Sequence, residues 1–473
     1  MYSMYDLLRF HGRARPGSAF LRLDDRQVEY GEMLARVDAV RVQLLDAGIR
    51  PGHRVAVCCA ESDDYVAVLI AVWSIGATAA PIEPQLEQAT QQTLLEVSRA
   101  NWRVTIMADG ARAPSVTALE PPDATPWYPG AEPPVQLLFT SGSSGKPKAV
   151  MLTQESLLAA SLECANSVNL TSADVQLTTV PFWHAYGQNR GLSATLYTGA
   201  CIAPVFDDDL SKRLAALERI EPTVLLSMAS FYGFLAFSKR SLGAQIRVAV
   251  SGAAPLPEPI KERFERLYGI PLLRTYGLTE FLLISCERLG ERRAPHGVGY
   301  PARGVEMRIV ADGDQPVGDP NEAGRIHVRG CPAMQGYLGR PDKRITDDGW
   351  LDTEDIGVLN DDGLRVLGRA SSFIKRSGYK VYPVEVQTML ASHPDVIDVA
   401  VAPFNSALGT EELTAQVVVR DKTQIDADAL LQFCRERMPD YKVPSRCTIV
   451  DAVTKLPSGK PDLVRITRDA THA

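Results

Sequence analysis

The chain has 473 residues, of which 45% are hydrophobic and 23% charged, a composition typical of a soluble globular protein. It is too long for a single core, and we expect about two to four packed units. This composition excludes a disordered, collagen-like or disulfide-scaffold chain. Fifty basic and 57 acidic residues give a net charge of −7, and no segment concentrates Lys and Arg. A nucleic-acid partner is therefore not expected.

The eight cysteines are scattered, without the paired C-x-x-C spacing of a zinc site, and they suit a reducing compartment. Residues 1–13 lack the apolar core of a signal peptide. Residues 65–82 carry no charge, but Ser74, Gly76 and Pro81 interrupt them. They indicate a buried helix that runs into a strand, not a membrane span. We expect a cytoplasmic protein without membrane insertion.

Helical and strand patterns alternate along the first two thirds of the chain. Residues 30–47 have the periodicity of a surface helix, and residues 55–59 and 224–227 are short apolar runs bounded by Gly or Pro. This alternation predicts an α/β fold with helix-covered parallel sheets. From about residue 305, short strands separated by Gly, Asp and Pro predict a smaller β-rich subdomain.

A second change of pattern follows Gly368. The segments beyond it alternate helix and strand within about one hundred residues, which is enough for a separate α+β domain. These segments are 384–392, 396–402, 413–419, 427–437 and 447–450. We predict an N-terminal domain over 1–368, a hinge at 369–372 and a C-terminal domain over 373–473.

The most informative segment is T-S-G-S-S-G-K-P-K at residues 140–148, between two apolar runs. Its small residues allow backbone N–H groups to point into one concavity, and its hydroxyl and ammonium groups complete an anion site. The segment is not a Walker A loop, because Gly142 and Gly145 are three apart and Pro147 follows Lys146. A polyphosphate site is the prediction, and a flexible polar turn is the alternative.

This loop resembles the signature of the adenylate-forming superfamily, which includes acyl-CoA synthetases, nonribosomal-peptide adenylation domains and luciferase. Six further segments match that superfamily in the same order, over more than 300 residues in all. They are P-F-W-H-A-Y-G at 181–187, S-G-A-A-P-L at 251–256, T-Y-G-L-T-E at 275–280, G-W-L-D-T-E-D at 349–355, G-R at 368–369 with I-K at 374–375, and P-S-G-K at 457–460.

The resemblance implies a two-step reaction with ATP and Mg²⁺. A carboxylate attacks the α-phosphorus of ATP to give an acyl adenylate and pyrophosphate, and an acceptor then displaces AMP. Thr279 would contact the α-phosphate, and Glu280 would hold Mg²⁺. Taken alone, Glu280 would more often be a solvated carboxylate. The β- and γ-phosphates would bind the loop at Thr140, Ser141, Gly142, Ser143, Ser144, Gly145 and Lys148.

The same resemblance assigns the rest of the nucleotide site. Tyr276 would stack on adenine, and Asp355, assisted by Arg369, would accept both ribose hydroxyls. Without the motif, Asp355 would be read as a turn residue. The remaining nucleotide-binding positions would be Gly252, Ala253, Ala254, Thr275 and Gly277.

Lys460 would bridge the attacking carboxylate and the α-phosphate and stabilise the charge that develops. The superfamily carries this lysine on a mobile C-terminal domain, which rotates so that the loop around Gly378 lines an acceptor channel with Lys375. His184 resembles a gate between the acid pocket and that channel more than a general base, although its pKa range would suit proton transfer.

The acid pocket would be lined by Tyr186, Ser227, Phe231, Phe281 and Leu282. Ala185 stands where amino-acid-activating relatives carry Asp, which disfavours an α-amino acid. Thr275 and Phe281 would shorten the cavity and favour an aryl or short acyl carboxylate. The counter-reading is that these side chains pack in the core and leave the pocket unchanged.

Three residues depart from the superfamily pattern. Ser371 replaces the usual hinge Asp or Lys, Glu354 replaces the Gly of T-G-D, and Ala149 replaces a Gly. None of these changes removes a proposed catalytic group.

The acceptor remains open from the sequence. Coenzyme A is the first expectation, and a carrier-protein phosphopantetheine or an amine is the alternative. A non-catalytic nucleotide-binding relative is a further alternative of another class. The chain would act as a monomer or homodimer on a small carboxylic acid.

Overall fold

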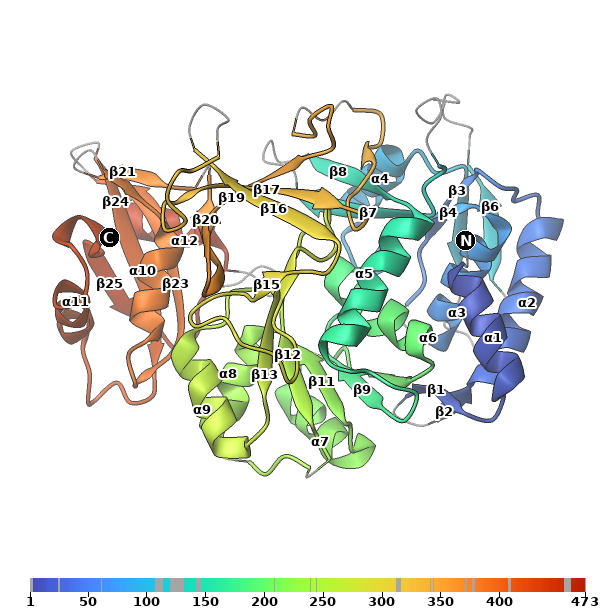
Figure 1. The fold of residues 1–473 in the computed structure, drawn as a ribbon, viewed down its shortest axis with the longest axis horizontal. Helices are drawn as coiled ribbons and strands as arrows, with labels where there is room; N and C mark the ends of the chain where they lie inside the picture. The colour runs from blue at the N-terminus through green and yellow to red at the C-terminus, as the bar shows by residue number, and fades with distance from the viewer. Residues whose placement is uncertain are drawn as a thin grey trace.

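A computed structural model describes residues 3–23, 26–60, 62–106, 114–119, 132–141, 146–207, 209–238, 240–243, 245–311, 316–340, 342, 344–370, 372–376, 379–406, 410–454 and 461–472. Its helices gather against two large sheets and one small one (Figure 1). The helices are α1 (Met4–Ala14), α2 (Tyr30–Asp46), α3 (Asp63–Ile75), α4 (Gln88–Ser98), α5 (Gln154–Ser167), the π-helix η1 (Gly187–Ser193), α6 (Ala194–Thr198), α7 (Leu210–Ile220), α8 (Ala229–Ser238), α9 (Glu258–Tyr268), α10 (Pro383–Ala391), α11 (Ala427–Arg435), the 3₁₀-helix η2 (Asp440–Lys442) and α12 (Leu463–His472).

The larger sheet has nine strands, and its centre is parallel. From β13 through β12, β11 and β9 to β10, neighbouring strands run in the same direction, whereas β14, β15 and β2 are antiparallel additions at the two edges. In spatial order the strands are β15 (Tyr300–Pro301), β14 (Ser285–Cys286), β13 (Leu272–Tyr276), β12 (Val248–Ser251), β11 (Val224–Ser227), β9 (Val175–Thr178), β10 (Cys201–Pro204), β1 (Ala19–Arg22) and β2 (Gln27–Glu29).

The second large sheet has seven strands and combines a parallel centre with antiparallel hairpins. In order they are β18 (Gly336–Tyr337), β8 (Pro147–Leu152), β7 (Gln136–Ser141), β4 (Thr78–Pro81), β3 (Arg54–Val57), β5 (Trp102–Thr105) and β6 (Ser115–Ala118). The expectation of parallel, helix-covered sheets is thus confirmed at the centre of both sheets and is wrong at their edges. Hydrophobic patterning alone does not reveal the direction in which an edge strand pairs, whether its partner is near in the sequence, as for β1 and β2, or distant, as for β8 and β18.

The uncharged segment 65–82 is a buried helix followed by a strand, as predicted. Helix α3 is buried along nearly its whole length, and Gly76 ends it with a φ of 77° before β4 begins at Thr78. No helix in the described part of the chain is long and apolar enough to cross a membrane.

A four-stranded antiparallel sheet begins where the pattern changes near residue 305. Its order is β16 (Val305–Val310), β17 (Gly324–Gly330), β19 (Leu351–Asn360) and β20 (Gly363–Arg369). In Figure 1 it lies above the nine-stranded sheet, between the N-terminal elements and the C-terminal residues. It is the predicted β-rich portion.

A core of its own holds the last hundred residues together. Its buried side chains, from Ile374 to Val443, belong to the strands and helices beyond β20. The strands are β21 (Ile374–Arg376) and β22 (Tyr379–Val381), which pair with each other, and β23 (Val396–Asn405), β24 (Glu411–Val419) and β25 (Arg446–Ile449), which form a sheet. The division at 369–372 remains our prediction, and Ser371 lies outside the described residues.

This C-terminal portion packs against α8. The Phe237 ring of α8 lies between two guanidinium groups, with the Arg263 carbon 4.7 Å and the Arg420 carbon 4.9 Å from its centroid. Arg263 belongs to α9, and Arg420 directly follows β24. The packing is visible at the left of Figure 1, where α8 lies beside β23.

Candidate active site

Four adjacent parallel strands of the nine-stranded sheet each end at a residue with a hydroxyl group. Strands β9, β11, β12 and β13 end at Thr178, Ser227, Ser251 and Tyr276, so these residues meet at one edge. The Thr179 and Ser227 hydroxyls lie 2.6 Å apart. Ligands of open α/β sheets bind at such carboxyl ends. The segments 181–187, 251–256 and 275–280, which are far apart in the sequence, come together here.

Tyr186 closes this edge against Gly252. A Cβ built on Gly252 would lie 2.6 Å from two ring carbons of Tyr186 and 2.7 Å from the Thr275 methyl group. The Tyr186 hydroxyl donates to the Val250 carbonyl at 3.3 Å. Only glycine permits this approach of ring to backbone. Tyr186, Gly252 and Thr275 therefore share one small volume, which combines a predicted acid-pocket residue with two predicted nucleotide-site residues.

Asp355 lies at the centre of a second group. Its Oδ2 accepts from the Tyr276 hydroxyl at 2.5 Å, and its Oδ1 lies 3.0 Å from Arg369 Nε across the β19–β20 ladder. The Thr353 hydroxyl accepts from the Asp355 N–H at 3.1 Å. Burial raises the pKa of the Asp355 carboxyl above its ordinary value, against the opposing effects of Arg369 and the Tyr276 hydrogen bond. The three residues predicted for adenosine are thus in direct contact.

Glu280 is held by residues that the sequence analysis did not identify. Its Oε1 accepts from the Tyr337 hydroxyl at 2.6 Å and lies 3.6 Å from an Arg344 nitrogen. Lys148 Nζ lies 4.6 Å from the centroid of the Tyr337 ring. Tyr337 reaches this position because β18 pairs with β8, the strand that carries Lys148. No motif in the sequence predicts that β18 pairs with β8.

The Arg344 guanidinium connects Glu280 to Glu354, which precedes Asp355 in the sequence. It lies 2.9 Å from Asp342 Oδ2 and 3.2 Å from Glu354 Oε2, and it also donates to the Tyr337 hydroxyl. Glu354 has a φ of 62°, a conformation that suits the glycine of the superfamily pattern. The Glu354 carboxylate, next to Asp355 in the sequence, therefore pairs with Arg344.

The site fits Mg²⁺ only if the phosphates supply further ligands. The described residues contain no group of three or more His, Cys, Asp or Glu side chains that could hold a metal. Glu280 makes both of the contacts above through Oε1. Mg²⁺ commonly binds one or two carboxylates together with phosphate oxygens. One buried carboxylate is consistent with that mode.

The glycine-rich loop connects an antiparallel hairpin. Thr140 pairs with Lys148 and Ser141 pairs with Pro147 across β7 and β8. A Walker A loop instead leads from a strand into a helix. Thr140 and Lys148 are partly buried at the loop end of this hairpin. Gly142, Ser143, Ser144 and Gly145 lie outside the described residues, and the placement of the Ser141 side chain is not described.

The remaining nucleotide-site positions lie around the same edge. Ala253, with a φ of 62°, and Ala254 are exposed in the turn after β12. Gly277 is exposed, and a Cβ there would lie 2.5 Å from the Leu282 carbonyl oxygen. Thr279, two residues after Gly277, is half-buried.

The residues that we predicted for gating and acyl transfer are exposed where the structure describes them. His184 is exposed, and its Nδ1 accepts from the Tyr186 N–H at 3.2 Å. Lys375 has an exposed side chain in β21, and its N–H donates to Glu411 at 2.9 Å. Gly378 and Lys460 lie outside the described residues.

Two of the predicted acid-pocket residues belong to the hydrophobic core. Phe281 is fully buried in the largest core cluster, and Phe231 is buried in the core between α8 and the nine-stranded sheet. Leu282 is partly buried against the largest cluster. Both phenylalanines therefore pack in the core, which is the alternative that the sequence analysis kept open.

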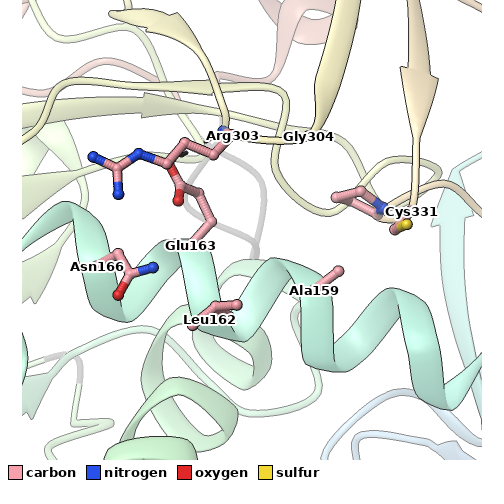
Figure 2. Close-up of a pocket in the computed structure, with 8 residues that line it drawn as sticks. Ala159, Leu162, Glu163, Asn166, Arg303, Gly304 and Cys331 are labelled. Atoms are coloured by element: carbon pink, nitrogen blue, oxygen red, sulfur yellow. Dashed lines mark hydrogen bonds between the residues drawn. The ribbon is translucent and has the colours of Figure 1, made fainter.

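A small surface pocket of about 220 Å³ lies beside α5 (Figure 2). Ala159, Leu162 and Asn166 of α5 face Arg303, Gly304 and Cys331 across it. None of the predicted site residues lines this pocket. Its carboxylate, Glu163, accepts hydrogen bonds from Arg288. We assign it no part in the chemistry.

Comparison with known proteins identifies relatives over the full chain. The model of the AMP-binding enzyme family matches residues 8–338, and that of the AMP-binding enzyme C-terminal domain matches residues 385–460. A feruloyl-CoA synthase from an Amycolatopsis species is 29% identical over 95% of each chain. An oxalate–CoA ligase from Arabidopsis thaliana is 30% identical over 88% of each chain.

A solved structure shows the same architecture. It is the o-succinylbenzoate coenzyme A synthetase from Bacillus subtilis in complex with ATP and a magnesium ion. It superposes with a TM-score of 0.81 and 25% identity, over 97% of this chain and 98% of that one.

Proposed function

The chain belongs to the AMP-binding, adenylate-forming enzyme family and is an ATP-using, AMP-forming acid–thiol ligase, and from this premise we propose that it activates an aryl or short acyl carboxylate and transfers the acyl group to coenzyme A. The observation that carries the proposal is the contact of Tyr276, Asp355 and Arg369 next to Glu280, at the carboxyl edge of the nine-stranded sheet.

The ribose of ATP would bind at Asp355. A buried carboxylate with two acceptor oxygens can accept both vicinal hydroxyls of a ribose. Arg369 and Tyr276 already fix the plane of this carboxylate, so little side-chain entropy is lost when the nucleotide binds. Adenine would lie in the turn around Ala253 and Gly277, beside the Tyr276 ring.

The phosphates would extend from this corner toward Glu280 and Lys148. Glu280 would hold a magnesium ion, which when bound supplies positive charge to the phosphate oxygens. Thr140, Lys148 and Thr279 would donate to the phosphates from the hairpin and from the turn. Tyr337 and Arg344 hold the Glu280 carboxylate in one orientation before any ligand arrives.

In the first step a carboxylate oxygen attacks the α-phosphorus, and the bond to the bridging oxygen of pyrophosphate breaks. Two anions meet in this step, so positive charge must be in place before they react. Lys460 would supply it from the C-terminal portion. In the second step the thiol sulfur attacks the acyl carbon, AMP leaves, and the thiol proton passes to solvent.

The aryl or short acyl class is supported by the side chains that lie over Gly252. The Tyr186 ring and the Thr275 methyl group leave no room for a Cβ at that position, so a compact acid suits this part of the site better than a long chain. The relatives named above are a feruloyl-CoA synthase and an oxalate–CoA ligase, named for an aryl and a short acid. Coenzyme A as acceptor rests on the same two names.

The test is carboxylate-dependent pyrophosphate release by the purified protein across aryl, short-chain and long-chain acids, with and without coenzyme A. We expect release with an aryl or short acid and acceleration by coenzyme A. Release that coenzyme A does not change would replace this acceptor with a carrier protein or an amine. Release by long-chain acids alone would refute the substrate class, and no release with any acid would favour a non-catalytic relative.

A further inference from the structure

Arg190 is a buried cation that lacks a complete set of partners. It lies in η1, directly after the gate segment, and its side chain is 3% exposed. One terminal nitrogen donates to the Ser167 hydroxyl at 3.0 Å and to the Cys164 carbonyl at 3.4 Å. Its Nε and other terminal nitrogen are buried and have no hydrogen-bond partner among the described residues. Burying such donors without partners is costly.

A neighbouring arginine shows what a purely structural pairing looks like in this fold. Arg288 is also buried, and both its Nε and a terminal nitrogen donate to Glu163. Glu163 therefore already serves another cation. In the described part of the chain, no carboxylate forms an ion pair with Arg190, and Glu163, the acidic residue near it, pairs directly with Arg288.

Further unpartnered polar groups lie in η1 and at the end of β12. Both amide atoms of Gln188 are buried without a partner, as are the hydroxyls of Ser193 and Ser251. Gln188 and Ser193 belong to η1, as Arg190 does, and Ser251 ends β12. π-Helices are rare and occur frequently at functional sites. Buried polar groups are nearly always satisfied, so a cluster of unsatisfied ones indicates a bound molecule or ordered water.

The cluster adjoins the edge that the proposed function assigns to the acid. Arg190 is four residues after Tyr186 and on the same face of the helical segment, and Tyr186 lies over Gly252. Cys286, whose thiol influences the pKa of Arg190, pairs in register with Thr275. Arg190 is thus a close neighbour of Tyr186 and of the β13–β14 pair that carries Thr275.

We propose that Arg190 binds a second anionic group of the acid substrate, at the end of the pocket opposite the reacting carboxylate. This inference rests on the proposed function and narrows its substrate class to short or aryl dicarboxylic acids. A guanidinium can bind a carboxylate through two parallel hydrogen bonds, and its free Nε and terminal N–H groups are the pair that such binding uses.

The experiment compares matched acids that differ only in the distal carboxylate: butanoate with butanedioate, and benzoate with benzene-1,3-dicarboxylate. The rate of ATP- and acid-dependent AMP formation is measured for the wild-type protein and for Arg190→Gln and Arg190→Lys. We expect kcat/KM for a diacid to exceed that for its monoacid at least about tenfold, since a site built for a polar group rejects analogues that lack it. Arg190→Gln should remove that ratio mainly through KM, and Arg190→Lys should keep part of it.

Arg292→Gln is the control, because Arg292 is an exposed arginine paired with Asp362 on the surface. Equal kcat/KM for monoacids and diacids in the wild type overturns the inference and leaves the proposed function intact. If Arg190→Gln does not fold, the wild-type ratio and Arg190→Lys decide. If ATP binds but no acid supports AMP formation, the proposed function fails and the inference fails with it.

Discussion

At the scale of single residues, the proposed chemistry depends on two buried carboxylates with different partners. Asp355 is fixed by Arg369 and Tyr276, and Glu280 by Tyr337 and Arg344. The motifs identify Asp355, Glu280, Tyr276 and Arg369, because their spacing is local. They do not identify Tyr337, which the pairing of β18 with β8 brings near Glu280, or Arg344, which donates to the Tyr337 hydroxyl.

Asp355→Asn should weaken ATP binding roughly tenfold or more, because a hydrogen bond to a charged acceptor contributes about 1.5–3 kcal/mol. In the wild type, ATP affinity should fall as the pH decreases through the raised pKa of Asp355, and in Asp355→Asn this dependence should be absent. Calorimetric titration with ATP across pH measures both. Asp361→Asn, in the exposed β19–β20 turn, is the matched control.

The same pKa shift has a stability consequence with a defined sign. The folded pKa of Asp355 is raised above 3.8, so the native state holds the proton more tightly than the unfolded state. The unfolding free energy of the wild type relative to Asp355→Asn should therefore decrease as the pH rises from 3.8 through the folded pKa. An increase over that range would contradict the assigned burial.

Tyr337→Phe should reduce the unfolding free energy by about 1–3 kcal/mol, because it leaves buried Glu280 without its hydroxyl donor. The ring that lies beside Lys148 is kept, so packing should change little. Chemical denaturation measures the effect. Tyr300→Phe removes an exposed 3.3 Å hydrogen bond to a carbonyl and should change stability by less than about 0.5 kcal/mol. Equal effects in the two variants would refute the role of Tyr337.

At the scale of helices and strands, the sequence predicts where each element lies better than it predicts which elements are neighbours in the fold. Residues 30–47, 224–227 and 384–392 form helix, strand and helix close to the expected bounds, since apolar periodicity reports the buried face of each element. The β7–β8 hairpin, the edge strands and the π-helix η1 depend on contacts between distant segments. Periodicity carries no information about those contacts.

Gly252→Ala tests the contact between β12 and the gate segment. The added methyl group would meet the Tyr186 ring at 2.6 Å, which forces the ring to move. We expect the KM for the acid to rise about ten- to a hundredfold while the protein still folds, because the obstacle is side chain and a shift of about 1 Å at a site is costly. Gly243→Ala, where nothing lies within 4 Å, is the control. An unchanged KM would exclude this wall from the site.

At the scale of the whole molecule, two portions with their own cores meet at α8. The core beyond Ile374 is continuous within itself, and the Arg420–Phe237 contact is one of the links across the boundary. The change of sequence pattern after Gly368 indicated a second folding unit. It could not indicate how that unit docks, because docking surfaces are chemically similar to ordinary surface.

Arg420→Ala should change the balance of the two half-reactions. A cation–π contact at a partly exposed site contributes about 0.5–1 kcal/mol, so its loss should shift a two-position equilibrium about two- to fivefold. The ratio of pyrophosphate exchange to thioester formation reports that shift. Arg437→Ala removes a similar contact, to Phe433, within the C-terminal portion and should leave the ratio unchanged. A rigid docking of the two portions predicts no difference between these variants.

The most direct test of acid activation is acid-dependent exchange of labelled pyrophosphate into ATP without coenzyme A, in the wild-type protein and in Lys460→Ala. We predict exchange by the wild type and its loss in Lys460→Ala, with ATP binding retained, because the lysine would act on the charge that develops in the reaction. Unchanged exchange in Lys460→Ala would contradict the role of that lysine. Thioester formation by a wild type that shows no exchange would contradict an acyl adenylate intermediate.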